Sequence, residues 1–325
     1  MLGAAQLTGG AAARAASADA DGHGVKGREH VKDVRNTGKG RTPTRAAGKK
    51  KAEAGGGNGP DLPGAWTAYG VLLQHFRRLA GLSQKDLGEA IGYSLEQVAS
   101  VEQGRRPAKE AFTTAADRVL EARGALVALQ PEVDRAKLPP FFRNFALIEA
   151  DVVSRFSYDP LLVPGLLQTE AYARAVFAGH CPPPSEEEVD QLTEARLARQ
   201  KLLARVPLAE LSFIVGEEVL RDPVGDAQVM RGQLEHLLKV VELRNVAVQV
   251  MPARRGFHTG MNGPFVVVET QKRRQLGYFE SQGVGCVVQE ADVVSDFGMR
   301  YGKLRSQALN VEESARLIGR IAGET

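Results

Sequence analysis

Residues 81–107, GLSQKDLGEAIGYSLEQVASVEQGRRP, constrain the fold of this chain more than any other segment. Ser83 precedes a helical pattern and has Asp86 three residues later, and Ser94 precedes a second pattern with Gln97 at the same spacing. Pairs of this kind satisfy the free N–H groups at helix N-termini. The segment therefore predicts two short helices, one beginning at Ser83 and one at Ser94.

A tight turn is predicted between these two helices. Gly92 stands at the end of the first helix, where glycine enters a left-handed conformation without steric cost. Helices joined by so short a turn cross steeply, so their contact requires a small residue and branched partners. Gly88, Val98 and Val101 stand at the contact positions.

Helical periodicity continues from Trp66 to Leu129 and predicts one compact all-α unit. Apolar residues of the flanking helices are expected to complete its core. These residues are Leu72, Leu73, Phe76, Leu79, Leu82, Leu87, Ile91, Phe112, Val119 and Leu120.

The outward face of the second helix, Ser94–Gln103, is predicted to read base edges in the major groove of double-stranded DNA. The residues expected there are Ser94, Leu95, Glu96, Gln97 and Ser100. Gln97 has the amide that pairs with adenine. Glu96 faces a polyanion, so it either accepts a hydrogen bond from a cytosine amino group or tilts away into solvent.

Four polar residues flank the predicted recognition helix and are expected to bind DNA phosphates. Gln84 and Lys85 lie at the N-terminus of the first helix, where free N–H groups and the helix dipole favour an anion. Arg105 and Arg106 follow the second helix. Phosphate contacts of this kind fix the orientation of a protein on the duplex.

The stretch FRRLAGLSQKDLGEAIGYSLEQVASVEQGRR resembles the phage-repressor, XRE-type helix-turn-helix family. The resemblance implies a lambda-repressor-like domain of five helices in which Arg77 pairs with Glu102, and a protein that binds DNA as a homodimer. Leu95 and Glu96 depart from the family pattern. They leave open a second interpretation, in which the module has lost DNA binding and contacts only protein.

The predicted domain organisation has four parts: a disordered basic tail at residues 1–60, the helix-turn-helix domain at 61–128, a linker at 129–140 and a C-terminal domain at 141–325. The tail has 11 Lys/Arg and 5 Asp/Glu and almost no large apolar residue. It is either a phosphate-attracting arm or a solvated leader. The linker has three prolines and no periodicity, so helices are expected to stop there.

The C-terminal domain is predicted to be α+β. Helical patterns cover residues 141–156, 166–178, 185–205, 227–243 and 311–321, and strand-like patterns cover 211–215, 246–251, 265–269 and 276–280. The motifs LVPGLLQTEAYARAVF, EARLARQ, GFHTGMNGPF and GYFES resemble an actinobacterial family of regulators with a C-terminal DUF5753 domain. That resemblance implies a regulator related to sporulation repressors and antitoxin-like proteins, with a small companion protein as a possible partner.

Other chemistry has little support in the sequence. Glu217, Glu218, His236 and His258 form no catalytic triad and no metal-ligand spacing, so neither an enzyme nor a cofactor nor a metal site is expected. The two cysteines are far apart, and the chain begins without a signal-peptide pattern, which favours a cytoplasmic protein.

Aromatic residues on the predicted strands, Phe213, Phe265, Tyr278 and Phe279, either line a pocket for a small-molecule effector or belong to the core. The leading hypothesis is a dimeric repressor. The alternative is an antitoxin-like interaction protein that binds its companion through the C-terminal domain.

Overall fold

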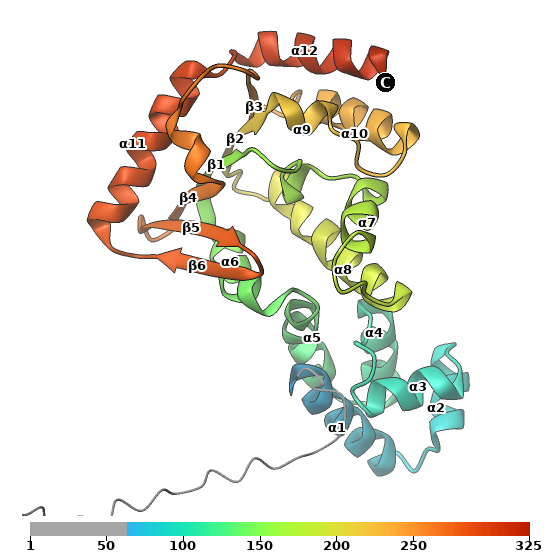
Figure 1. The fold of residues 1–325 in the computed structure, drawn as a ribbon. Helices are drawn as coiled ribbons and strands as arrows, with labels where there is room; N and C mark the ends of the chain where they lie inside the picture. The colour runs from blue at the N-terminus through green and yellow to red at the C-terminus, as the bar shows by residue number, and fades with distance from the viewer. Residues whose placement is uncertain (1–63) are drawn as a thin grey trace, which may run out of the picture. The chain divides into compact units, whose positions relative to one another are not determined.

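The computed structural model describes residues 64–325, so the predicted basic tail at residues 1–60 lies outside the described residues. The N-terminal part of the described chain consists of five helices (Figure 1). They are α1 (Gly64–Leu79), α2 (Gln84–Ile91), α3 (Leu95–Glu102), α4 (Glu110–Val119) and α5 (Ala125–Ala136). This is the all-α fold predicted from the sequence.

One hydrophobic core joins these five helices. Leu73 of α1, Leu87 of α2 and Val98 of α3 are all fully buried in it. The indole N–H of Trp66 in α1 donates a hydrogen bond to the carbonyl of Val133 in α5 at 3.0 Å. The first and last helices of the module are therefore fastened together.

The turn between α2 and α3 has the predicted form. Gly92 caps α2 in a left-handed conformation with a φ of 79°. A Cβ on Gly88 would lie 2.5 Å from the carbonyl oxygen of Tyr93, so only glycine allows α2 to approach this turn so closely. The turn therefore requires glycine at both Gly88 and Gly92.

The expectation that helices stop within residues 130–140 is wrong. Helix α5 continues through Pro131 to Ala136, and α6 begins at Pro140. Proline removes one backbone donor from a helix, at a cost that tertiary packing can offset. Here Leu126 and Val133 are fully buried in the core of the module, on either side of Pro131.

The C-terminal domain combines helices with a six-stranded sheet. Its principal helices are α6 (Pro140–Ala150), α7 (Glu170–Ala178), α8 (Glu186–Ala198), α9 (Glu217–Arg221), α10 (Ala227–Val240), α11 (Ala291–Gln307) and α12 (Val311–Glu324). Its strands are β1 (Val152–Asp159), β2 (Glu210–Gly216), β3 (Val246–Met251), β4 (Phe265–Thr270), β5 (Gln275–Ser281) and β6 (Val284–Val288). Short 3-10 turns are η1 (Gly165–Leu167), η2 (Arg199–Leu203) and η3 (Thr259–Asn262). Within residues 64–325, no helix has both the length and the apolar character needed to cross a bilayer.

The sheet is mixed, with the strand order β3-β2-β1-β4-β5-β6. Strands β1, β2 and β3 are parallel, whereas β4, β5 and β6 continue from β1 in antiparallel steps. Parallel neighbours require crossover connections, which here contain α7 to α8 and α9 to α10. The α+β class predicted for this domain is confirmed.

Helices cover both faces of the sheet (Figure 1). Leu211 and Phe213 of β2 belong to the core beneath α10 and α12, while Ile214, which points to the other face, packs in the core beneath α11. Such two-sided burial explains why β2 has apolar residues on both faces, with Leu211, Phe213 and Val215 on one and Ile214 on the other. Phe213 is thus a core residue, one of the two roles considered for it.

Three elements differ from the sequence-based expectation. The helical pattern predicted over residues 141–156 ends at Ala150, and Val152–Asp159 forms β1. Strand β6 and helix α11 were not predicted at all. β1 lies between β2 and β4, so its conformation depends on partners that are distant in sequence.

Candidate nucleic-acid interface

Helix α3 begins with a complete capping box. The Ser94 hydroxyl accepts a hydrogen bond from the Gln97 N–H at 3.2 Å, and the Gln97 side-chain oxygen accepts one from the Ser94 N–H at 2.9 Å. Helix α2 begins in the same way with Ser83 and Asp86. The amide oxygen of Gln97 is therefore used within the protein, while its amide nitrogen remains available to a ligand.

The first turn of α3 is exposed on one side. Leu95, Glu96 and Gln97 are exposed, and Leu95 retains 51% of its accessible surface although it is a large apolar residue. Val98 and Val101, on the opposite side of the helix, are buried in the core. The exposed turn is the part of a helix-turn-helix protein that contacts base edges.

The prediction that Ser100 belongs to this exposed face is wrong. Ser100 is buried, and its carbonyl accepts hydrogen bonds from the N–H groups of Arg105 and Arg106 at 2.9 and 3.3 Å. The segment after α3 therefore folds back over Ser100. The exposed residues of the predicted set are therefore those before it, Ser94 to Gln97.

The predicted pair of Arg77 and Glu102 is present and almost completely buried. Arg77 Nη2 donates to Glu102 Oε2 at 2.9 Å, and Arg77 Nε donates to Oε1. Gln84 Nε2 donates to Glu102 Oε2 at 2.7 Å. Burial alone raises the pKa of the Glu102 carboxyl, but the hydrogen bonds from Arg77 and Gln84 outweigh it, so this pKa lies below its ordinary value.

The two residues expected to bind phosphate at the start of α2 have different surroundings. The side chain of Gln84 is turned toward Glu102, so only its backbone N–H at the helix N-terminus is suited to an anion. Lys85 is exposed and lies 3.8 Å from Glu89, a distance at which an exposed pair contributes little. Lys85 is therefore free to bind phosphate.

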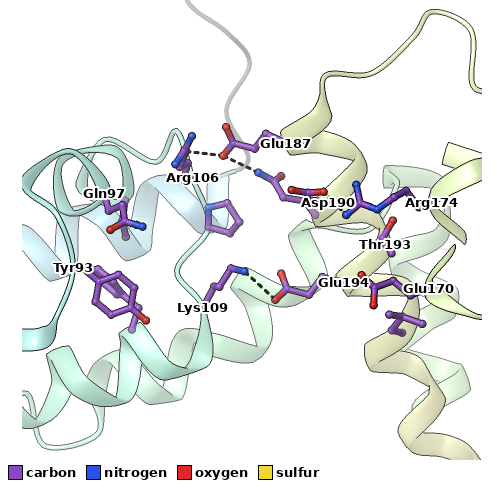
Figure 2. A pocket seen from close by; sticks show the side chains of 15 residues that line it. Tyr93, Gln97, Arg106, Lys109, Glu170, Arg174, Glu187, Asp190, Thr193 and Glu194 are labelled. Atoms are coloured by element: carbon purple, nitrogen blue, oxygen red, sulfur yellow. Dashed lines mark hydrogen bonds and ion pairs between the residues drawn. The ribbon is translucent and has the colours of Figure 1, made fainter. Parts of the chain in front are cut away.

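Arg105 and Arg106 follow α3 and are both exposed. Arg106 Nε lies 2.7 Å from Glu187 Oε1, in the first turn of α8 (Figure 2). No local pattern predicts this contact, because Glu187 is distant in sequence and belongs to the C-terminal domain. Arg106, one of the residues predicted to bind phosphate, is therefore paired with a carboxylate of the protein itself.

A cavity of about 710 Å³ lies where the module meets the C-terminal domain (Figure 2). Gln97, Arg106 and Lys109 line it from the module. Lys109 Nζ lies 3.6 Å from Glu194 Oε1, so a second cation of the module faces a carboxylate of α8. The acidic side of α8, formed by Glu187, Asp190 and Glu194, therefore faces basic residues next to the recognition helix.

Two of the titratable residues weighed as catalytic groups, Glu217 and His258, contact neighbouring groups of the fold. Glu217 accepts a hydrogen bond from the Ala253 N–H at 3.0 Å, which lowers the pKa of its carboxyl, and another from Arg221. The ring of His258 packs edge-on against Tyr158. In residues 64–325, no group of three or more His, Cys, Asp or Glu side chains is arranged to hold a metal ion.

Two family models match the chain. The model described as "Domain of unknown function (DUF5753)" matches residues 142–320, and the model described as "Helix-turn-helix domain" matches residues 68–130. Both matches fall on the segments whose motifs carried the resemblances, which are confirmed.

No curated protein matches the chain. A matching solved structure is that of the clp gene regulator ClgR from Corynebacterium glutamicum, which is 24% identical. The match covers 22% of this chain and 74% of that chain, with a TM-score of 0.20.

Proposed function

Because the chain belongs to the DUF5753 family and has a helix-turn-helix domain before it, we propose that it is a transcriptional regulator that docks α3 in the major groove of DNA. The observation that carries this proposal is the exposed first turn of α3. Its capping box holds Gln97 at the helix end, and Leu95 and Glu96 are exposed beside it. Gln97 would donate its amide to a base, and Leu95 would contact a thymine methyl group.

Phosphate binding would orient α3 on the duplex. Lys85 and the N-terminus of α2 lie on one side of the recognition helix, and Arg105 and Arg106 follow its other end. Contacts of this kind supply affinity without sequence information and make binding sensitive to salt. We assign no catalytic step, cofactor or metal to the protein.

DNA binding would require Arg106 to exchange Glu187 for a phosphate. Both side chains are about half exposed, so their ion pair is weak enough to break at modest cost. Once this ion pair is broken, the unpaired Glu187 carboxylate of α8 would lie near the DNA and repel its phosphates. The C-terminal domain therefore opposes binding in this conformation.

The finer part of the proposal is a homodimeric repressor. Two copies would each place one α3 in half-sites about 34 Å apart, and the bound pair would block a promoter. The antitoxin-like alternative predicts instead that a small companion protein co-purifies with the chain through its C-terminal domain.

Competition with groove-specific ligands tests the docking mode. Methyl green occupies the major groove and should displace the protein from a labelled duplex, whereas distamycin occupies the minor groove and should not. Displacement by distamycin alone would contradict major-groove docking. Absence of any duplex binding would contradict the proposed function itself.

A further inference from the structure

A second cavity lies entirely within the C-terminal domain and the segment that leads into α6. Its volume is about 790 Å³, and an adjoining inner recess of about 120 Å³ shares many of the same lining residues. The lining comes from α6, the end of β1, η1, α7, α8, η3, β4, β5 and α11. Cavities of this size and mixed lining are typical of small-molecule sites.

Aromatic side chains form much of the wall. Phe141, Phe177, Phe265 and Phe279 line both the cavity and the recess. Near the opening, Leu161 is 73% exposed and Phe279 is 40% exposed. Exposed aromatic and aliphatic groups around a cavity favour a ligand with an apolar body.

Arg196 of α8 supplies a cation at this wall. Its Nη1 donates to the side-chain oxygen of Gln168 at 2.8 Å, and its guanidinium lies over the Phe177 ring at 4.7 Å. A Cβ on Gly165 would lie 3.0 Å from Arg196 Cδ, so glycine leaves the room that this arginine occupies. Burial, followed by repulsion from Arg199, lowers the pKa of Arg196 to about 10.

The neighbouring arginines of the recess are paired, whereas Arg196 is not. Arg155 and Arg199 both bind Glu149, at 3.0 and 2.9 Å. Among the residues that the structure describes, no carboxylate lies within ion-pair distance of Arg196. The carboxylates of Glu280 and Glu149 act on Arg196 only from a longer distance, so an anionic ligand could still become the direct partner of this largely enclosed guanidinium.

Asp159, at the end of β1, and Glu280 of β5 place carboxylates on the wall of the cavity. The Asp159 carboxylate accepts a hydrogen bond from the Ser157 hydroxyl at 2.6 Å, and it has no ion-pair partner among residues 64–325. Asp159 can therefore accept a further hydrogen bond from a ligand donor.

We propose that this cavity binds a small organic carboxylate with an aromatic or apolar body. The carboxylate would pair with Arg196, and the body would lie among Phe141, Phe265 and Phe279. The phenylalanine and arginine positions are on different elements, so the site depends on the folded domain. Its existence does not depend on DNA binding.

Calorimetric titration of the full chain with 2-naphthoate and with its neutral analogue, 2-naphthamide, tests the proposal. The carboxylate should bind more tightly than the amide. Arg196→Met should weaken 2-naphthoate binding by about 10-fold or more, since hydrogen bonds to charged groups are the stronger kind. Arg231→Met removes an exposed arginine of α10 and should leave the affinity unchanged.

Phe279→Ala is a second variant, because this partly exposed side chain can be removed without disturbing the charges. It should weaken both compounds several-fold with an unchanged unfolding temperature. The proposal is wrong if neither compound binds, if both bind the native chain equally, or if Arg196→Met folds and retains the affinity for 2-naphthoate. Should Arg196→Met not fold, the comparison of the two compounds and Phe279→Ala still decide.

Discussion

Arg106 Nε and Glu187 Oε1 lie 2.7 Å apart, which joins the segment after the recognition helix to the first turn of α8. The arginine side chain is 50% exposed and the glutamate side chain 43% exposed, so solvent screens the pair. A phosphate that binds Arg106 must displace Glu187. This contact is one of two ion pairs between the helix-turn-helix module and α8, the other being Lys109–Glu194.

Glu187→Gln should raise the affinity for DNA, because it frees Arg106 and removes a carboxylate beside the helix-turn-helix module. An exposed ion pair contributes up to about 1 kcal/mol, so the gain should be at most about 5-fold from that pair. Fluorescence anisotropy with a labelled duplex measures it. Glu186→Gln makes the same charge change at an exposed neighbour with no ion pair among the described residues, and should change affinity less. Equal effects of the two variants would show that only net charge matters.

Gln97→Ala should weaken binding to the preferred site more than binding to random DNA, because it removes a base contact worth about 1 to 3 kcal/mol. It also removes a cap, since Gln97 accepts from the Ser94 N–H. Asp86→Ala removes the equivalent cap from α2, where Asp86 accepts from the Ser83 N–H at 2.9 Å, and serves as the control. An equal loss of affinity for the preferred site and for random DNA would show that Gln97 does not contact a base.

Arg105→Ala should weaken binding to the preferred site and binding to random DNA to a similar degree. Loss of one phosphate contact should reduce the slope of log affinity against log salt by about 1. Titrations at several salt concentrations measure this slope. A selective loss on the preferred site, with the slope unchanged, would mean that Arg105 contacts a base.

Glu102→Gln should lower the free energy of unfolding by about 3 to 5 kcal/mol, because it leaves Arg77 buried without its carboxylate. The pKa of Glu102 is depressed in the folded protein. The stability that this carboxylate contributes is therefore present above its unfolded pKa and is lost as the pH falls through the folded value.

Urea unfolding across an acidic pH series measures both effects. Glu89→Gln, which breaks only the exposed pair with Lys85, is the control and should cost little. A loss in Glu102→Gln no larger than in this control would contradict the structural role of the buried pair.

Asp159→Asn should change the pH dependence of stability. Burial raises the pKa of Asp159 from 3.8 to about 6. A group with a raised folded pKa contributes stability below its unfolded pKa, and this contribution is lost as the pH rises through the folded value. The free energy of unfolding should therefore fall more steeply between about pH 4 and pH 6 in the native chain than in the variant. Parallel curves would show that burial does not perturb Asp159.

The helix-turn-helix part of the fold was predictable because its signals are local. The two residues of each capping pair are three positions apart. The tight turn between α2 and α3 requires the left-handed conformation that Gly92 adopts. Ser100 departs from the predicted exposed face because the backbone of Arg105 and Arg106 folds back onto it, and this depends on the path of the chain after α3.

The remaining differences arise from contacts between distant segments. Pro131 predicted a break, but α5 is stabilised by packing against the rest of the module. Residues 152–156 fall in the predicted helical pattern but form part of β1, where pairing with β2 and β4 favours the extended form. The Arg106–Glu187 pair and the Arg196 cavity likewise join residues whose proximity no sequence spacing encodes.

Selection of bound DNA from a random duplex pool, at near-physiological salt, is the decisive measurement of sequence-specific binding by α3. We expect an enriched two-fold symmetric motif, recovered with the native chain and lost with an Arg105→Ala, Arg106→Ala double variant. A native chain that enriches no sequence would contradict sequence-specific DNA binding and favour the companion-binding alternative.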